Sequence, residues 1–115
     1  MITDLMKAQV TNDLVTLINA GSAQVGLGGN STSPAATALD VPISGASATV
    51  VAVKSDENVL EIKVTVNGSN IAGKVIREVG VFDTDSNLLA RNNFTGVGPF
   101  SSSEILELFI IWEIE

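Results

Sequence analysis

The sequence predicts a mainly β fold, a small antiparallel β-sandwich or barrel with one amphipathic helix at the N-terminus. Several apolar segments of strand length are separated by turn signals at the spacing of antiparallel hairpins. The one segment with helical periodicity comes first. The 115 residues fit a single domain. Within it we expect the helix over residues 1–21, a loop-rich connection over 22–47 and an antiparallel β region over 48–115.

The predicted helix covers residues 3–20. Thr3 can cap its first turn, Asp4 is favourable near its N-terminus, and Gly21 suits the left-handed position that ends many helices. Apolar residues recur every four positions and two more widen the stripe, which predicts an amphipathic helix: Ile2, Met6, Val10, Leu14 and Ile18, with Leu5 and Leu17.

The connection after the helix is rich in Gly, Ser, Thr, Ala and Pro. A short strand can form within residues 23–28, and Gly28-Gly29-Asn30 is typical of a turn. We nevertheless expect an ordered connection and not a linker, because it contains several apolar anchors: Val25, Leu27, Leu39, Val41 and Ile43.

Two strands are predicted over residues 48–54 and 59–67, joined by the polar turn 55–58. In the second strand, Leu60, Ile62, Val64 and Val66 alternate with polar residues, which predicts one buried and one solvated face. Asn67-Gly68 is a strong turn signal after it.

The next strand, residues 74–82, is apolar on both faces, and residues 83–87 form an acidic turn before an antiparallel strand over 88–94. A long loop then leads to the last strand, within residues 104–115. Its even positions are continuously apolar, whereas its odd face carries Ile105, Phe109 and Ile111 between glutamates. We therefore expect this strand to be central, or covered by a partner on its second face.

The composition excludes several classes of function. The net charge is -7, and six basic residues scattered singly make a poor phosphate-binding surface, so nucleic-acid binding is disfavoured. The chain has no Cys, His or Tyr, so it lacks the commonest general base, the commonest zinc ligand and a thiol nucleophile. No apolar stretch is long enough to span a bilayer. We expect no enzymatic activity, no cofactor or metal, and no nucleic-acid or membrane partner.

The apolar content is high for a soluble monomer, with 45% hydrophobic residues and a mean hydropathy of +0.38. We expect part of this apolar surface to be buried against other subunits.

Three motifs resemble functional sites and have simpler interpretations. Asp83, Asp85 and Asn87 match the opening of a calcium loop, but Leu88 and Phe94 stand where it needs glycine and glutamate, so a plain turn is expected. The stretch GLGGNS has no following lysine and is expected to be a turn, not a phosphate loop. The serines at 101–103 have no histidine or nearby lysine to act as base and are expected to be loop residues.

Arg77 and Glu78 are two charges inside an apolar strand. Neighbouring residues on a strand point to opposite faces, so at least one charge must be partly buried. Two interpretations remain open: an ion pair or backbone hydrogen bond that fixes strand register, and a charge that pairs across a subunit contact.

Three short motifs occur in order: IREVGVFD, NLLARNNF and LFIIWEI. With the upstream stretch GLGGNSTSPAATAL, they resemble structural proteins of tailed viruses, in particular the tail-collar fibre group and the N-terminal attachment domains of phage tail fibres. The resemblance covers residues 21–115. The related proteins often carry a lysine before the last strand, where this chain has GPFSSSE.

The resemblance implies a virion structural protein that assembles, as a trimer or ring, with copies of itself and other virion proteins in the tail, baseplate or fibre-attachment region. The chain lacks distal fibre repeats, so we expect a complete small virion protein. A capsid-surface decoration, turret or head-fibre base is the alternative, and a carbohydrate-binding β-sandwich module is an alternative of another class. The residues expected at structural or interface positions are Arg77, Glu78, Gly80, Phe82, Arg91, Phe94, Phe109, Ile111 and Trp112.

Overall fold

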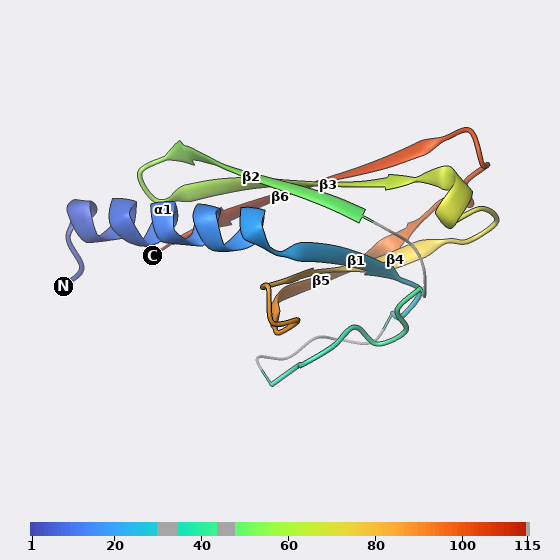
Figure 1. Ribbon diagram of the computed structural model, residues 1–115, viewed down its shortest axis with the longest axis horizontal. Helices are drawn as coiled ribbons and strands as arrows, with labels where there is room; N and C mark the ends of the chain where they lie inside the picture. The colour runs from blue at the N-terminus through green and yellow to red at the C-terminus, as the bar shows by residue number, and fades with distance from the viewer. Residues whose placement is uncertain (30–34, 44–47, 115) are drawn as a thin grey trace.

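The computed structural model describes residues 1–29, 35–43 and 48–114, and it confirms the predicted fold class. A single antiparallel sheet, in the order β5-β4-β1-β2-β3-β6, curls into a half-barrel. One N-terminal helix precedes the sheet in the chain and packs against it (Figure 1). The elements are α1 (Asp4–Ala20), β1 (Ser22–Gly26), β2 (Ala48–Asp56), β3 (Val59–Asn67), β4 (Ile76–Phe82), β5 (Leu88–Val97) and β6 (Ile105–Glu113), with a 3-10 turn at Gly68–Asn70.

Helix α1 begins where the sequence predicts. The Thr3 side chain accepts a hydrogen bond from the Met6 amide, and Asp4 lies in the first turn. The apolar stripe is buried only toward its C-terminal end, where Ile18 enters the core and Leu14 packs against it. Ile2, Leu5 and Met6 are exposed and Val10 is half-buried, because the first turns of α1 project beyond the sheet (Figure 1).

The prediction that Gly21 is left-handed is wrong. Its φ is -93° and its ψ is -149°, outside the left-handed region, and the next residue begins β1. Glycine is needed there for a different reason, since a Cβ atom would overlap the carbonyl oxygen of Phe82 on the neighbouring strand.

Asn19, which the sequence analysis did not single out, fastens α1 to the sheet. Its side-chain amide nitrogen donates to the Ala52 carbonyl oxygen at 2.8 Å, and its side-chain oxygen accepts from the Ala52 amide at 2.7 Å. The Asn19 side chain thus pairs with β2 as a neighbouring strand would.

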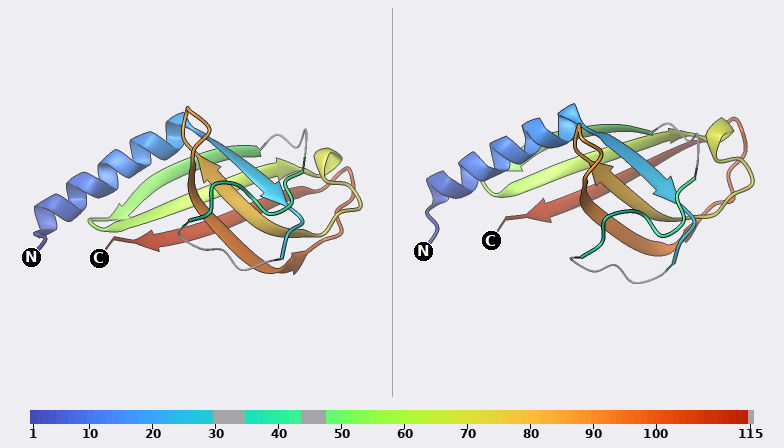
Figure 2. Two further views of the ribbon diagram at one scale, coloured as in Figure 1. Left: turned by 90° about the horizontal axis from the view of Figure 1, so that it is seen from below. Right: turned by 60° about the horizontal axis from the view of Figure 1, so that its bottom comes forward.

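Strand β3 has the predicted bounds and alternation, and the β2–β3 turn is shorter than predicted, because β2 extends to Asp56 and leaves Glu57 and Asn58 between the two strands. The inward residues of β3 are fully buried, and each contributes about 1.5–3 kcal/mol by leaving water: Leu60, Ile62, Val64 and Val66. The sheet is strongly curled (Figure 2). Phe94 of β5 and Leu108 of β6 pack against the same core.

Strand β6 is not central, which corrects one alternative from the sequence. It pairs with β3 and forms one edge of the sheet. Its even residues Leu106 and Ile110 are buried in the core, as the pattern predicts, whereas Ile105, Phe109 and Ile111 on its odd face are exposed. The other alternative, a partner over that face, stays a prediction.

Strand β4 is apolar on both faces because both are covered. Val79 and Val81 belong to the core, and the other face lies under the connection that follows β1. That connection is ordered over residues 35–43, as expected: the Leu27 amide donates to the Val41 carbonyl at 2.9 Å, and the Ile43 amide donates to the Val25 carbonyl at 3.2 Å. The turn predicted at Gly28-Gly29-Asn30 includes Asn30, which lies outside the described residues.

Within the described ranges, no helix combines the length and the apolar character needed to cross a membrane.

Candidate functional site

The charged pair on β4 separates into one exposed and one buried residue. Arg77 points to solvent, whereas Glu78 is 0% exposed. The expectation that at least one charge is partly buried is therefore confirmed, and Glu78 is the one that must be compensated inside the fold.

Four groups surround the Glu78 carboxylate. Its Oε2 accepts from the amides of Gly28 at 2.8 Å and Val41 at 2.7 Å, and its Oε1 accepts from the Asp40 amide at 2.7 Å. Arg91 Nε lies 3.3 Å from Oε1, a charge contact and not a well-aligned hydrogen bond. The carboxylate has about four acceptor positions, and three backbone hydrogen bonds together with the positive charge of Arg91 compensate it, which supports the first interpretation, a paired structural charge.

The three amides belong to both ends of the connection, so Glu78 ties that connection to β4. We call this group the Glu78 anchor: Gly28, Asp40, Val41, Glu78 and Arg91. Asn93, opposite Glu78 in the β4–β5 pairing, adds a hydrogen bond from its side-chain nitrogen to the Gly28 carbonyl at 3.2 Å.

Glycine is required where the connection approaches the anchor. A Cβ atom on Gly28 would lie 2.5 Å from Glu78 Oε2, and one on Gly26 would lie at the same distance from it. The Gly-rich stretch GLGG is therefore a place where backbone must approach a buried carboxylate closely. The sequence could not identify Asp40 and Val41 as partners, because they contribute only main-chain amides.

Gly80 and Phe82 lie on the same face of β4 as Glu78. A Cβ atom on Gly80 would lie 2.7 Å from the Leu39 side chain, so the missing side chain leaves room for the connection. Leu39 and Phe82 are both buried, and Arg91 stands opposite Gly80 on β5. Thus the glutamate, glycine, phenylalanine and second arginine of the motif all hold the connection on this face.

The acidic turn after β4 is confirmed as a turn. Asp83 Oδ1 accepts from the amides of Asn87 and Asp85, both at 2.9 Å, and its Oδ2 accepts from the Asn87 side chain at 3.2 Å. The hydrogen bonds from the Asn87 backbone and side chain, with that from the Asp85 backbone, lower the pKa of Asp83 below its ordinary value of 3.8. Both oxygens are thus used within the turn.

The serines at the other end of the sheet also form a local turn. The Ser101 amide donates to Glu104 Oε1 at 2.7 Å, and the Ser101 and Ser103 hydroxyls are 3.1 Å apart. The expected loop is thereby confirmed.

The outer face of β2, β3 and β6 carries an apolar surface. Two charged side chains of β3, Lys63 and Glu61, lie between the apolar side chains of β2 and those of β6. Phe109 is 70% exposed and Ile111 is 66% exposed. The pairing places Phe109 opposite Lys63 and Ile111 opposite Glu61. We call these exposed apolar residues the outer patch: Val51, Val53, Ile105, Phe109 and Ile111.

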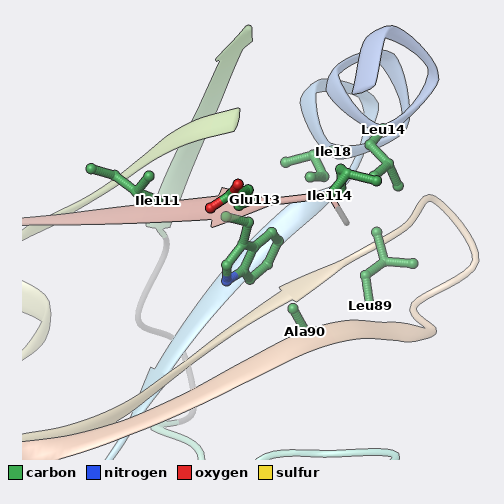
Figure 3. Close-up of a pocket in the computed structure, with 8 residues that line it drawn as sticks. Leu14, Ile18, Leu89, Ala90, Ile111, Glu113 and Ile114 are labelled. Atoms are coloured by element: carbon green, nitrogen blue, oxygen red, sulfur yellow. The ribbon is translucent and has the colours of Figure 1, made fainter. Parts of the chain in front are cut away.

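Trp112 and Phe94, unlike Phe109, lie toward the inside of the half-barrel. A cavity of about 450 Å³ opens between α1, β5 and the end of β6, and Trp112 is among the residues that line it. Figure 3 shows Leu14 and Ile18 of α1 on one side of this cavity and Leu89 and Ala90 of β5 on the other. Phe94 lines a second hollow, of about 390 Å³, between β5 and β6. The lining of the larger cavity is apolar apart from Glu113.

A second exposed apolar surface lies at the start of α1, away from the outer patch. It consists of Met1, Ile2, Leu5 and Met6. These residues include the first members of the apolar stripe of the helix.

Comparison with known proteins adds no assignment, since neither a protein-family model nor a curated protein sequence matches this chain.

Proposed function

We propose that this chain is a structural protein of a tailed virus particle, where it packs against copies of itself and other virion proteins in the tail, baseplate or fibre-attachment region. The observation that carries the proposal is the outer patch. Phe109 and Ile111 are large, apolar and about two-thirds exposed on a regular strand. Burying them against another chain would contribute about 1.5–3 kcal/mol each.

The Glu78 anchor supports the same proposal from the inside of the fold. The buried carboxylate holds the backbone of Gly28, Asp40 and Val41 against β4, so these parts of the connection are positioned before a partner binds. A surface that is already ordered loses little conformational entropy on association. This suits a building block that must present the same shape in every copy.

The assignment to a tailed virus is supported by the motifs, whose residue types now have a physical explanation. In IREVGVF the glutamate binds the connection, the glycine leaves room for Leu39, and the phenylalanine is buried on the same face. In LLAR the arginine supplies the counter-charge to Glu78. These positions, which hold the connection on β4 in this chain, are the ones on which the resemblance is based, and the virion role is proposed from that resemblance.

A carbohydrate-binding role receives less support. Sugar sites usually present an exposed aromatic face together with polar groups. Trp112 lies instead in an apolar cavity in which Glu113 is the charged neighbour, and the exposed aromatic Phe109 lies among the apolar side chains of the outer patch.

Cryo-electron microscopy of the parent particle tests the proposal and also separates a tail location from the capsid surface. We expect density for this fold, with its outer patch covered by a neighbouring chain. Purified particles whose protein inventory by mass spectrometry lacks this chain would refute the virion assignment.

A further inference from the structure

One edge of the sheet is open for pairing, and the hydrogen bonds of β6 show which of its groups are free to pair. At one end of β6 the Ile114 amide donates to the Asn58 carbonyl, and at the other the Gly68 amide donates to the Glu104 carbonyl, each at 2.7 Å. Even-numbered backbone groups thus face β3 at both ends, and the β3–β6 pairing has no register shift between them. Backbone groups alternate along a strand, so the odd-numbered ones point to the open edge: Ile105, Glu107, Phe109, Ile111 and Glu113.

The two edges of the sheet differ in whether they could accept another strand. Strand β5 pairs with β4 through two register shifts, and such irregularities bend an edge strand away from pairing. Strand β6 is regular over its nine residues and contains neither proline nor lysine, and its charged residues are the two glutamates Glu107 and Glu113. Strand β6 is therefore the edge that is suited to pair with another chain.

We propose that β6 pairs antiparallel with β6 of a second copy, about a two-fold axis at Phe109, so that the two half-barrels share one continuous sheet. The proposal rests on the proposed function, in that it names the surface through which copies of this chain meet. All five free positions would pair in this register, with about ten intermolecular hydrogen bonds. The contact is closed, so the apolar start of α1 stays available for other neighbours in a ring or particle.

The charges on β6 favour this register over its neighbours. It sets Glu107 opposite the partner's Ile111 and Glu113 opposite the partner's Ile105, so no glutamate directly faces another. A shift of two residues toward the C-terminus would set Glu107 against the partner's Glu113. A shift the other way would avoid that repulsion but leave Glu113 beyond the paired region, so the register centred on Phe109 has the largest overlap without an opposed charge pair.

The partner strand is β6 of a second copy, because the free edge of β6 is complementary to itself. On the outer face, Phe109 would contact the partner's Phe109 on the axis, and exposed isoleucines would pack beside it from both chains. An unrelated strand would need its own apolar residues at the same alternation, whereas β6 already has them.

A single introduced cysteine tests the axis. The chain has no cysteine, so Phe109→Cys can form a disulfide only between copies. Directly opposed hydrogen-bonded residues have Cα atoms about 5.5 Å apart, within the range of a disulfide. Val53→Cys is the matched control, because Val53 is also exposed on the outer face but would lie about 24 Å from the partner's Val53, at ~4.8 Å per strand.

The expected result is a disulfide-linked dimer for Phe109→Cys and little cross-linking for Val53→Cys, with unchanged circular dichroism for both. If the wild-type chain assembles but Phe109→Cys does not cross-link above the control, the two-fold contact is overturned while assembly as such stands. If the wild-type chain sediments as a monomer at every concentration, both this contact and the assembly in the proposed function are refuted.

Two charge variants test the register. Phe109→Glu would place two carboxylates face to face on the axis, and we expect the dimer dissociation constant to rise about tenfold or more. Ile111→Lys would face the partner's Glu107, and we expect it to keep or strengthen the dimer. Equal weakening by both variants would contradict this register.

Discussion

The most specific prediction concerns Glu78→Gln, a change that keeps the shape of the side chain and removes its charge. Glu78 is fully buried, and its two oxygens accept from three backbone amides and contact Arg91. Glutamine has an NH2 group in place of one carboxylate oxygen, and this group can only donate, so it must face one of these donors without forming a hydrogen bond. It does least harm on the Oε1 side, where the hydrogen bond from Asp40 and the charge contact with Arg91 are lost.

The magnitude follows from these two losses. A hydrogen bond to a charged group contributes about 1.5–3 kcal/mol, and a buried guanidinium without its counter-charge adds to the penalty. We therefore expect Glu78→Gln to lower the free energy of unfolding by about 2–4 kcal/mol, or Tm by about 8–15 °C for a domain of this size. Glu78→Ala also removes the acceptor of the Gly28 and Val41 amides. Its effect on the free energy of unfolding, about 3–5 kcal/mol, approaches the whole stability of a small domain.

Thermal unfolding followed by circular dichroism measures the effect, and Glu61→Gln is the matched control. Glu61 is an exposed carboxylate on β3, so its neutralisation should change stability by less than about 0.5 kcal/mol. Hydrogen exchange should show faster exchange of the Gly28, Asp40 and Val41 amides in Glu78→Gln. Equal Tm values for Glu78→Gln, Glu61→Gln and wild type would refute the view that the carboxylate anchors the connection.

Three further predictions concern other supports of the fold. Gly28→Ala should destabilise by about 1–3 kcal/mol, because its Cβ would overlap the anchor, whereas Gly29→Ala has space for the methyl group and should be tolerated. Asn19→Ala should lose about 1–3 kcal/mol with its two hydrogen bonds to β2, against little change for the exposed Asn12→Ala. Asp83→Asn should lower Tm at neutral pH, and the difference from wild type should shrink as pH falls through the depressed folded pKa, below 3.8, because the stabilising carboxylate of the wild type is then protonated.

Each of these predictions has a result that contradicts it. Equal melting temperatures for Gly28→Ala and Gly29→Ala would mean that the backbone does not approach the carboxylate closely. A neutral Asn19→Ala would show that apolar packing alone holds α1 on the sheet. A Tm difference for Asp83→Asn that stays constant from neutral to acidic pH would rule out the lowered pKa.

The helix and the strands could be predicted from the local sequence pattern, but which strands pair with one another could not. Alternation in residues 59–67 predicts strand β3 and its buried face, since both follow from a period of two. Nothing local tells an edge strand from a central one. The final strand is apolar enough for the middle of a sheet, yet it lies at the edge, because its place depends on pairing between distant segments.

The Glu78 anchor, too, could be predicted from the sequence only in part. That a charge beside Arg77 must be compensated follows from burial within an apolar strand. Which groups compensate Glu78 does not, because three of them are main-chain amides brought from elsewhere by a Gly-rich connection. Gly21 shows a related limit. A glycine after a helix predicts a left-handed turn, but here glycine is needed because a Cβ atom would overlap Phe82.

The central claim is that the exposed apolar surface of this chain is covered by other chains. Sedimentation velocity of the purified wild-type protein over a dilution series tests it most directly, with Phe109→Ser beside it as the variant that removes the largest exposed side chain of β6. We expect species larger than a monomer that dissociate on dilution, and dissociation at higher concentration for the variant. A wild-type chain that sediments as a monomer throughout, without aggregation, would contradict the claim.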